Sequence, residues 1–466
     1  MRDTIRFLLG ETPVEIASPR PTTTVLEWLR ARGLRGTKEG CAEGDCGACT
    51  VLLSEPDGGG LRHRAVNACL VFLPALDGRQ LRTVEHLGGA HPVQQAMVTH
   101  HASQCGFCTP GFVMSLAALH LQGGTDRAQA VEALAGNLCR CTGYRPILDA
   151  ALDACAGPPP DRTAEAQTAH SLRSLPTETL EIVAQGRRYV APRSLAQATA
   201  LLAARPEALL LAGGTDLGLL VTKARQTLPE IIALERVPEL TRIAVNADTI
   251  SLGAAALYED ALPVLEAEFP ALGALLRRLG SRQIRNRGTV GGNLGTASPI
   301  GDMAPALIAL DAHVVLASAA GERSVRLDEY FIGYRRTVRR PDELIARVEI
   351  PRGGAAGLHV WKVSKRAEED ISAVCGAFRL VLAQGRVADI RIGMGGVAAT
   401  PLRLVAVEQA MLGQRWDAAT LAAAESAMDG AIAPIDDMRA SARYRRLVAR
   451  NLLRRLFLHT TLEQAA

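Results

Sequence analysis

The segment CAEGDCGAC, residues 41–49, decides the fold of the N-terminal part of this chain. Its three cysteines and Cys69 follow the spacing C-x4-C-x2-C, with the fourth cysteine after 19 intervening residues. Three thiolates on one loop and a fourth on the next strand suit one [2Fe–2S] cluster. Glycine is frequent here because the backbone must approach the cluster and direct N–H groups at its sulfurs. The glycines are Gly36, Gly40, Gly44 and Gly47.

The residues on either side of this loop predict a small mixed α/β unit. Alternating patterns predict strands at 3–9 and 13–17, and a helix follows from about Thr22 to Gly33. Strand character resumes at 51–53 and 65–73. We therefore expect a β-grasp, plant-type ferredoxin-like domain over residues 1–85, with Cys41, Cys46, Cys49 and Cys69 as ligands. A Zn(Cys)4 site is the weaker alternative, because zinc sites usually pair two C-x2-C motifs or add histidine.

A second cysteine group occupies two short motifs, QCGFCTPG at 104–111 and NLCRCTGYR at 137–145. Apolar spacing of three and four predicts helices at 93–101, 110–121, 126–135 and 145–155. Both cysteine pairs then lie at helix N-termini, where the helix dipole favours thiolate and cluster charge. We expect a helical [2Fe–2S]-binding domain over 86–156, although spacing alone leaves Zn(Cys)4 open. The predicted ligands are Cys105, Cys108, Cys139 and Cys141.

Composition places these sites in a large globular protein. The chain has 466 residues, of which 48% are hydrophobic, so several domains are expected. Its formal net charge of +4 is small for this length and predicts no nucleic-acid partner. Nine of the ten cysteines precede residue 156, which concentrates redox chemistry at one end. No run of about 18 apolar residues and no signal peptide is evident. The expected location is the cytoplasm, with no membrane partner.

The remaining chain predicts a linker and two further α+β domains. Residues 157–177 contain a proline triplet and no apolar period, which predicts an exposed linker. We expect one domain over 178–350 and another over 355–466. In the first, a helix is expected at 261–279. Gly213-Gly214-Thr215-Asp216 joins a strand to a helix at 216–225, and Gly291-Gly292-Asn293 forms a second such loop. Both can present backbone N–H groups to a pyrophosphate, although a Gly-Gly turn alone is usually only a turn.

The cysteine motifs, with LLLAGGTDLGLL at 209–220 and TVGGNLGTASPIGD at 289–302, resemble the iron–sulfur and flavin parts of the molybdenum hydroxylases. The resemblance covers essentially the whole chain and implies two [2Fe–2S] clusters and FAD. It implies a multi-domain α+β fold, with 178–350 as the FAD-binding domain and 355–466 as a C-terminal flavoprotein domain. The implied FAD-binding residues are Leu210, Gly213, Gly214, Thr215, Asp216, Leu279, Gly292, Asn293, Thr296, Asp302, Leu344 and Lys362.

The resemblance also implies a role in electron transfer. Tyr334 and Arg335 match the family's region near the flavin face and are the implied NAD-binding residues; a surface turn is the alternative. No stretch resembles the large molybdopterin-binding domains, so the implied assembly adds a large molybdopterin-binding subunit, in a heterotetramer of two small and two large chains. The xanthine dehydrogenase branch, with NAD+ as acceptor, matches best. An aldehyde-type member and a stand-alone iron–sulfur flavoprotein NADH reductase stay open, and no catalytic acid or base is nominated.

Overall fold

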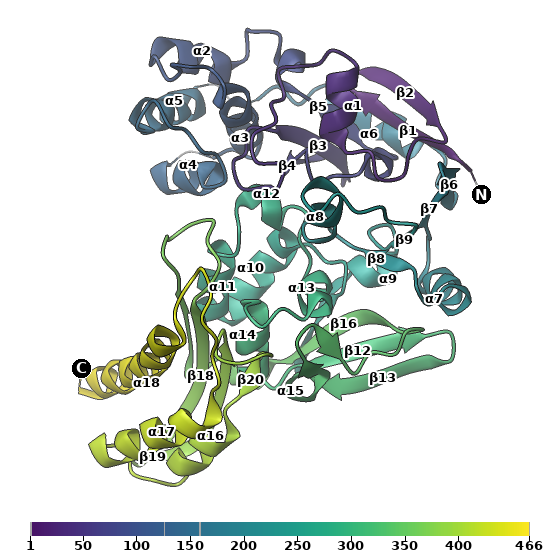
Figure 1. Cartoon of the computed structure of the whole chain (residues 1–466). Coiled ribbons are helices and arrows are strands. Elements are labelled where there is room, and N and C mark those ends of the chain that lie inside the picture. Colours follow the sequence, from purple (N-terminus) through teal and green to yellow (C-terminus); the bar gives the residue numbers. More distant parts are fainter. Residues whose placement is uncertain (1, 125, 158–159, 466) are drawn as a thin grey trace. The chain divides into compact units, whose positions relative to one another are not determined.

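The structure is a computed structural model that describes residues 2–124, 126–157 and 160–465. The chain forms two compact units, each built from separate segments. Figure 1 shows the chain coloured by sequence position. Unit 1 extends to Arg193 and adds Glu207–Arg236 and Gly280–Gly288. Unit 2 consists of Ser194–Pro206, Val237–Leu279 and the chain from Thr289 onward. Each unit is described by itself.

Unit 1 begins with a five-stranded sheet in the order β2-β1-β5-β3-β4. β1 pairs antiparallel with β2 and parallel with β5, so the sheet is mixed. Helix α1 starts at a capping box, in which Thr24 Oγ1 accepts from Glu27 N at 3.1 Å and the Glu27 carboxylate accepts from Thr24 N at 2.9 Å. Its Leu29 packs with Phe7 of β1 in one core. The elements are β1 (Thr4–Leu9), β2 (Thr12–Ala17), α1 (Val25–Ala31), β3 (Thr50–Asp57), β4 (Gly60–Asn67) and β5 (Gln80–Arg82).

Four helices follow and confirm the helical prediction for this part of the chain (Figure 1). Every residue of the third of them from Gly111 to Leu121 is buried, because this helix packs on its helical neighbours and also on β3 and β4. A helix that is apolar all round belongs in the centre of a domain. The helices are α2 (Pro92–Thr99), α3 (Thr109–Leu121), α4 (Arg127–Leu134) and α5 (Arg145–Ala156).

The interval predicted as an exposed linker contains a packed helix, α6 (Glu165–Arg173). Ala169 and Leu172 lie in a small core with Leu8 and Leu61 of the first sheet. Glu165 Oε1 lies 3.0 Å from His63 Nε2, and both side chains are buried. The prediction was wrong here because the apolar partners of α6 are about a hundred residues away in sequence. Pro158 and Pro159 of the predicted linker lie outside the described residues.

A four-stranded sheet, β6-β7-β9-β8, completes unit 1. Its Ile182, Leu211 and Ile231 share one hydrophobic core with the first sheet. The compact unit therefore cuts across the predicted 178–350 domain. The elements are β6 (Leu180–Ala184), β7 (Arg187–Ala191), β8 (Leu209–Leu211), α8 (Leu217–Thr222), β9 (Glu230–Ala233) and α12 (Arg282–Arg285).

The first layer of unit 2 is an antiparallel sheet in the order β10-β11-β16-β12-β13, with helices packed into its core. The helix predicted at 261–279 is two helices, because Pro270 forces Phe269 out of helical geometry (φ −131°, ψ 80°). The elements are α7 (Leu195–Ala204), α9 (Pro238–Thr241), β10 (Ile243–Val245), β11 (Thr249–Gly253), α10 (Tyr258–Glu268), α11 (Pro270–Arg277), α13 (Val290–Thr296), α14 (Met303–Ala309), β12 (His313–Ser318), β13 (Gly321–Arg326), α15 (Leu327–Tyr330), β14 (Phe331–Gly333), β15 (Arg336–Thr337) and β16 (Leu344–Pro351).

The second layer of unit 2 is the antiparallel sheet β17-β18-β19-β20, whose core is shared with three helices (Figure 1). The elements are β17 (Leu358–Val363), β18 (Val374–Ala383), β19 (Arg386–Gly395), β20 (Leu402–Arg403), α16 (Val405–Met411), α17 (Ala418–Ala431) and α18 (Ala442–Ala465). Within the described residues, no helix combines the length and the apolar character that crossing a membrane needs.

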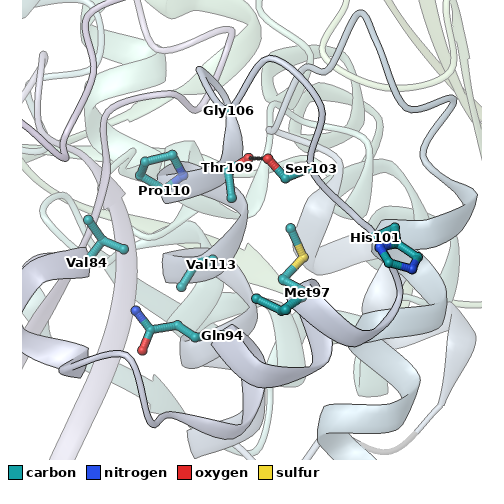
Figure 2. Close-up of a pocket in the computed structure, with 10 residues that line it drawn as sticks. Val84, Gln94, Met97, His101, Ser103, Gly106, Thr109, Pro110 and Val113 are labelled. Atoms are coloured by element: carbon teal, nitrogen blue, oxygen red, sulfur yellow. Dashed lines mark hydrogen bonds between the residues drawn. The ribbon is translucent and has the colours of Figure 1, made fainter.

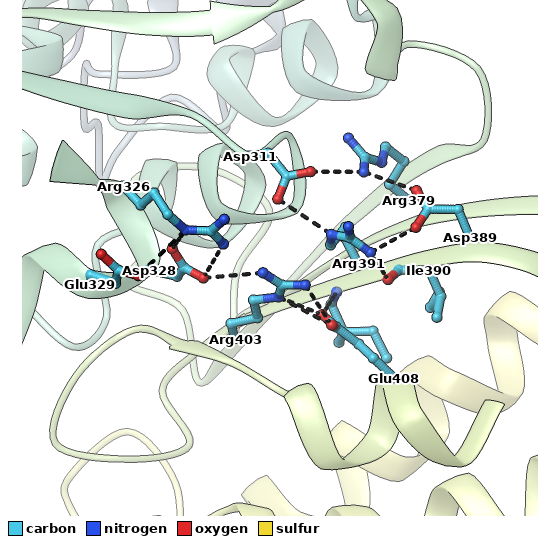
Figure 3. A network of polar contacts seen from close by, with 11 residues as sticks. Asp311, Arg326, Asp328, Glu329, Arg379, Asp389, Ile390, Arg391, Arg403 and Glu408 are labelled. Carbon is cyan, nitrogen blue, oxygen red and sulfur yellow. Dashed lines mark hydrogen bonds and ion pairs between the residues drawn. The ribbon is translucent and has the colours of Figure 1, made fainter. Parts of the chain in front are cut away.

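A network of ion pairs joins the two layers of unit 2 (Figure 3). Asp311, just after α14, accepts from Arg379 of β18 at 2.8 Å and from Arg391 of β19 at 3.3 Å. Arg403 of β20 pairs with Asp328 of α15 at 3.2 Å. Charges from both layers thus alternate in sign across the contact. A side chain that one ion pair already holds in place loses less conformational entropy when it forms a second pair.

Glu408→Ala is expected to destabilise unit 2 by about 2–3 kcal/mol, because it leaves the buried Ile392 N–H without an acceptor and leaves the Arg403 guanidinium with Asp328 as its remaining partner. The Glu408 side chain is 7% exposed, pairs with Arg403 at 2.9 Å and accepts from Ile392 N at 2.8 Å. Urea unfolding monitored by the fluorescence of Trp416, which lies in this core, measures the change.

Glu322→Ala is the matched control, because Glu322 pairs with Arg347 while 37% exposed. We expect it to cost less than about 1 kcal/mol. Equal losses in the two variants would show that the network adds nothing beyond an ordinary surface pair.

Candidate cofactor sites

The first cysteine group lies on the loop between α1 and β3, with Cys69 directly after β4. Its thiols stand in two pairs, Cys41 with Cys46 and Cys49 with Cys69. Backbone N–H groups point at sulfur: the N–H groups of Glu43 and Cys46 each lie 3.4 Å from Cys41 Sγ. The Cys46 thiol and these N–H groups lower the pKa of Cys41 to about 5. These contacts favour thiolate at Cys41, whereas the partner thiol and burial raise the pKa of Cys46 and of Cys69.

The second cysteine group joins the N-terminus of α3 to the loop before α5. We predicted both cysteine pairs at helix N-termini. Cys108 is the N-cap of α3, but Cys139 lies in the loop five residues before the α5 N-cap, Tyr144, so the prediction was wrong for that pair. The thiols again pair, Cys105 with Cys141 and Cys108 with Cys139. Cys139 N donates to Tyr144 Oη at 2.9 Å. This bond fixes the backbone at one ligand of the site.

In the second group, hydrogen bonds favour thiolate at Cys139, whereas burial raises the pKa of Cys108. Burial raises the pKa of Cys139, but hydrogen bonds from the Thr142 hydroxyl and from the N–H groups of Thr142 and Cys141 outweigh burial and lower the value to about 7. Cys105 and Cys141 are exposed, whereas Cys139 is buried. Sequence reasoning did not single out Thr142 or Tyr144, although both lie inside the quoted motif.

Paired thiols fit two-iron clusters. Across the described parts of the chain, no three Cys, His, Asp or Glu side chains come close enough together to hold a single metal ion. Each [2Fe–2S] cluster takes four thiolates, two on each iron. Two thiol pairs in each group, with N–H groups directed at the sulfurs, match that donor set.

The first glycine-rich loop, Gly213–Asp216, follows β8 in unit 1. Gly213 lies so close to the neighbouring backbone that a Cβ built on it would be 1.7 Å from the Arg287 carbonyl oxygen. Arg287 Nε donates to Gly213 O at 3.3 Å, and Glu235 holds Arg287 at 2.8 Å. The loop is therefore held in place from one side. Leu210 and Thr215 are half-buried, and Asp216 is exposed.

Sequence reasoning missed the support of this loop. Glu235 accepts from both Arg287 and Arg79, at 2.8 Å and 3.0 Å, and all three side chains are largely buried. The sequence did offer a hint of this support, because Arg287 lies two residues before the second quoted flavin motif, which begins at Thr289. The helix expected behind the loop is short, Leu217–Thr222, so the loop backbone is the element that suits a pyrophosphate.

The second glycine-rich loop forms the start of α13 in unit 2. Thr289 Oγ1 caps this helix by accepting from Gly292 N at 3.0 Å. Asn293 Oδ1 is buried and accepts no hydrogen bond from any described residue. A buried acceptor without a donor is costly, so this atom fits a ligand that brings one. Thr296 ends the same helix and is half-buried.

Three further implied FAD residues are buried in unit 2. Asp302 and Lys362 form a buried ion pair at 2.7 Å. Ser372 donates to the other oxygen of the Asp302 carboxylate, so this carboxylate is well supported from within the protein. Leu344 is fully buried at the start of β16, and Leu279 is half-buried after α11.

The implied NAD-binding residues lie at the tip of the β14–β15 hairpin. Tyr334 is 62% exposed, and Arg335 adopts a positive φ of 52°. An aromatic ring and a guanidinium at an exposed tip are available to a ligand.

A pocket of about 460 Å³ lies beside the Cys105–Cys108 loop (Figure 2). Met97 of α2 and Val113 of α3 line its apolar part. Gly106 of the cysteine loop and Thr109, the first residue of α3, also line it, and the hydroxyl groups of Ser103 and Thr109 form a hydrogen bond of 2.7 Å.

Four family models match successive parts of the chain. They are a 2Fe-2S iron–sulfur cluster binding domain at residues 7–73, a [2Fe-2S] binding domain at 83–152, an FAD binding domain in molybdopterin dehydrogenase at 183–353, and a CO dehydrogenase flavoprotein C-terminal domain at 359–460. Fold, paired thiols and these matches together define an iron–sulfur flavoprotein.

Known relatives agree with this class. Xanthine dehydrogenase of Emericella nidulans is 33% identical over 494 residues, which cover 92% of this chain and 36% of the relative. Aldehyde oxidase 2 of Cavia porcellus is 33% identical over 491 residues, covering 90% and 37%. A solved carbon monoxide dehydrogenase structure from Hydrogenophaga pseudoflava is 30% identical with a TM-score of 0.55, covering 59% of this chain and 96% of that one. The chain belongs to the molybdenum hydroxylase family, and the resemblance found in the sequence is confirmed. It spans little more than a third of the length of the curated relatives it matches.

Proposed function

We propose that this chain is the electron-transfer part of a xanthine dehydrogenase, which oxidises hypoxanthine and xanthine to urate. A large molybdopterin-binding subunit supplies the electrons, in an assembly of two small and two large chains, and NAD+ is the acceptor. The observation that carries the proposal is the presence of two paired-thiol sites and two glycine-rich loops in a chain related to xanthine dehydrogenases. When bound, the clusters exchange single electrons and FAD combines two of them for transfer as a hydride.

The exposure of the cysteines supports an order in which electrons pass through the two cluster sites. Cys105 and Cys141 are exposed, so the second site is open to a partner. Cys49 and Cys69 are buried. Directly after Cys69, the backbone of Leu70 packs on the α8 segment, where a Cβ at Gly218 would lie 3.3 Å from Leu70 O. We infer that the second cluster receives electrons and the first passes them toward the flavin.

Apolar side chains around the exposed site support docking of the large subunit there. Phe107 of the cysteine loop is 48% exposed, and Val98 at the pocket rim is 72% exposed. Large exposed apolar side chains that adjoin a functional loop favour a protein contact over a solvated surface. The proposed FAD residues are those of the two glycine-rich loops with Leu279, Leu344, Asp302 and Lys362, and the proposed NAD residues are Tyr334 and Arg335.

The cofactor content of the purified chain tests the proposal. We expect about four irons, four acid-labile sulfides and one FAD per chain. NADH should reduce an artificial acceptor, whereas this chain without a molybdopterin-binding partner should not oxidise xanthine. About two irons accompanied by zinc would make the second cysteine group structural and would contradict the proposed route.

An aldehyde-oxidising complex is the second candidate, because the Cavia porcellus aldehyde oxidase is as similar to this chain as the xanthine dehydrogenase. Assay of the complex with xanthine and with an aliphatic aldehyde separates the candidates. Turnover of the aldehyde alone would reject the purine assignment but keep the electron route, and reduction of O2 in place of NAD+ would reject the acceptor.

A further inference from the structure

The single-turn helix α12 belongs to unit 1, although it lies within the predicted FAD-binding domain. Consecutive side chains of this segment enter the N-terminal part of the chain. Arg285 is 1% exposed and pairs with Glu132 of α4 at 2.8 Å. Asn286 donates to Ala65 O of β4 at 2.9 Å. The segment is therefore anchored just after Gln283.

Gln283 lies at the centre of a buried polar network. Its Nε2 donates to Ser115 Oγ and to Asn137 Oδ1, each at 2.9 Å. The Ser115 hydroxyl donates to the same Asn137 oxygen at 2.7 Å. Gln283 and Ser115 are each 1% exposed and Asn137 is 5% exposed. Two donors meet Asn137 Oδ1, so the amide nitrogen of Asn137 must face the opposite way.

The amide nitrogen of Asn137 holds the first cysteine loop. It donates to Gly47 O at 3.2 Å, between Cys46 and Cys49. Asn137 itself lies two residues before Cys139, a predicted ligand of the second site. This amide therefore bridges the two cysteine groups, and Gln283, together with Ser115, holds its orientation.

The two cysteine loops touch at this bridge without an intervening side chain. Leu138 N donates to Cys46 O at 3.0 Å. A Cβ at Gly47, whose φ is +65°, would lie 2.2 Å from Gly136 O. The separation of the two sites thus depends on backbone contacts and on the Asn137 amide.

We propose that Gln283 is a positioning residue for electron transfer between the two clusters. This inference rests on the proposed function, in which both cysteine groups hold [2Fe–2S] clusters. Electron tunnelling slows steeply as the distance between centres grows, so a bridge that keeps two loops in contact controls the rate. Without Gln283, Asn137 Oδ1 would lose one of its two donors and keep the Ser115 hydroxyl, and a turn of that amide would release Gly47 O.

Gln283→Met tests the proposal, since it retains side-chain length and removes both donors. In the full chain reduced with dithionite, we expect an altered magnetic coupling between the clusters in the electron paramagnetic resonance spectrum. After flash photoreduction, we expect transfer between the clusters to slow by about tenfold, the lower range for loss of a residue that supports metal ligands. Iron and sulfide content should stay at the parental level.

Gln80→Met is the matched control. Gln80 is fully buried, its Nε2 donates to Gly10 O at 2.8 Å, and its Oε1, like that of Gln283, accepts no hydrogen bond from the described residues. It bonds the turn between β1 and β2 instead of a cysteine loop. We expect Gln80→Met to lose stability and to keep the parental coupling and rate.

Ser115→Ala offers a second variant with a smaller volume change, and we expect it to shift the coupling in the same direction. Parental coupling and parental rate in both Gln283→Met and Ser115→Ala would overturn the inference. Fewer than about four irons in the parent chain would instead overturn the proposed function.

Discussion

Replacing Cys139 with serine is expected to remove the second cluster, so that iron falls from about four to about two per chain while FAD is retained. A serine hydroxyl stays protonated at neutral pH and is a harder, weaker ligand than a thiolate whose pKa the surroundings lower to about 7. Electron flow from the molybdopterin-binding subunit should fall by more than about a hundredfold, because the distance to the first site becomes too long. NADH oxidation with an artificial acceptor should persist. Iron analysis and both assays measure these effects.

Cys155→Ser is the control for this substitution. Cys155 is half-buried in α5 and belongs to neither thiol group. We expect this variant to keep four irons and both activities. A Cys139→Ser protein with a full iron content would remove Cys139 from the ligand set.

Gly213→Ala is expected to weaken FAD binding by about ten- to a hundredfold while leaving both clusters in place. A methyl group at this position would lie 1.7 Å from the Arg287 carbonyl oxygen, so one of two backbone segments must move. Overpacking of this kind costs about 1–3 kcal/mol, and each 1.4 kcal/mol is a tenfold change in affinity. Flavin absorbance after dialysis against dilute FAD measures the loss.

The control for this glycine is Gly59→Ala in the β3–β4 turn, where a Cβ would have no atom within 4 Å. It should retain FAD. Retention of FAD by Gly213→Ala would mean that the loop does not contact the dinucleotide, whereas loss of iron together with FAD would indicate general unfolding of unit 1.

The helices α2–α5 could be predicted from the sequence because their signals are local. Apolar spacing, Pro110 and Pro146 near two helix starts, and the glycines after α3 act within a few residues of each element. The prediction of one continuous helix at 261–279 was wrong at Phe269. Pro270 was a local signal for a break there, but the helical spacing of the apolar residues was given more weight.

Helix α6 could not be predicted, because its stability comes from distant partners. Glu165 meets His63, and Leu172 meets Leu8, across separations of more than a hundred residues. The same holds for the placement of 207–236 and 280–288 in unit 1. Tertiary packing overrides a sequence boundary when the apolar faces on either side share one core.

The sequence by itself determined which residues can carry the chemistry: eight cysteines in two motifs and two glycine-rich loops. Ligand spacing of this kind is local, because a loop must bring its thiolates to one cluster within a few residues. Only the tertiary structure decided how those thiols pair, which group is exposed and how Gln283 meets Asn137. These depend on contacts between residues far apart in the chain, which no local pattern encodes and which packing and hydrogen-bond satisfaction select together.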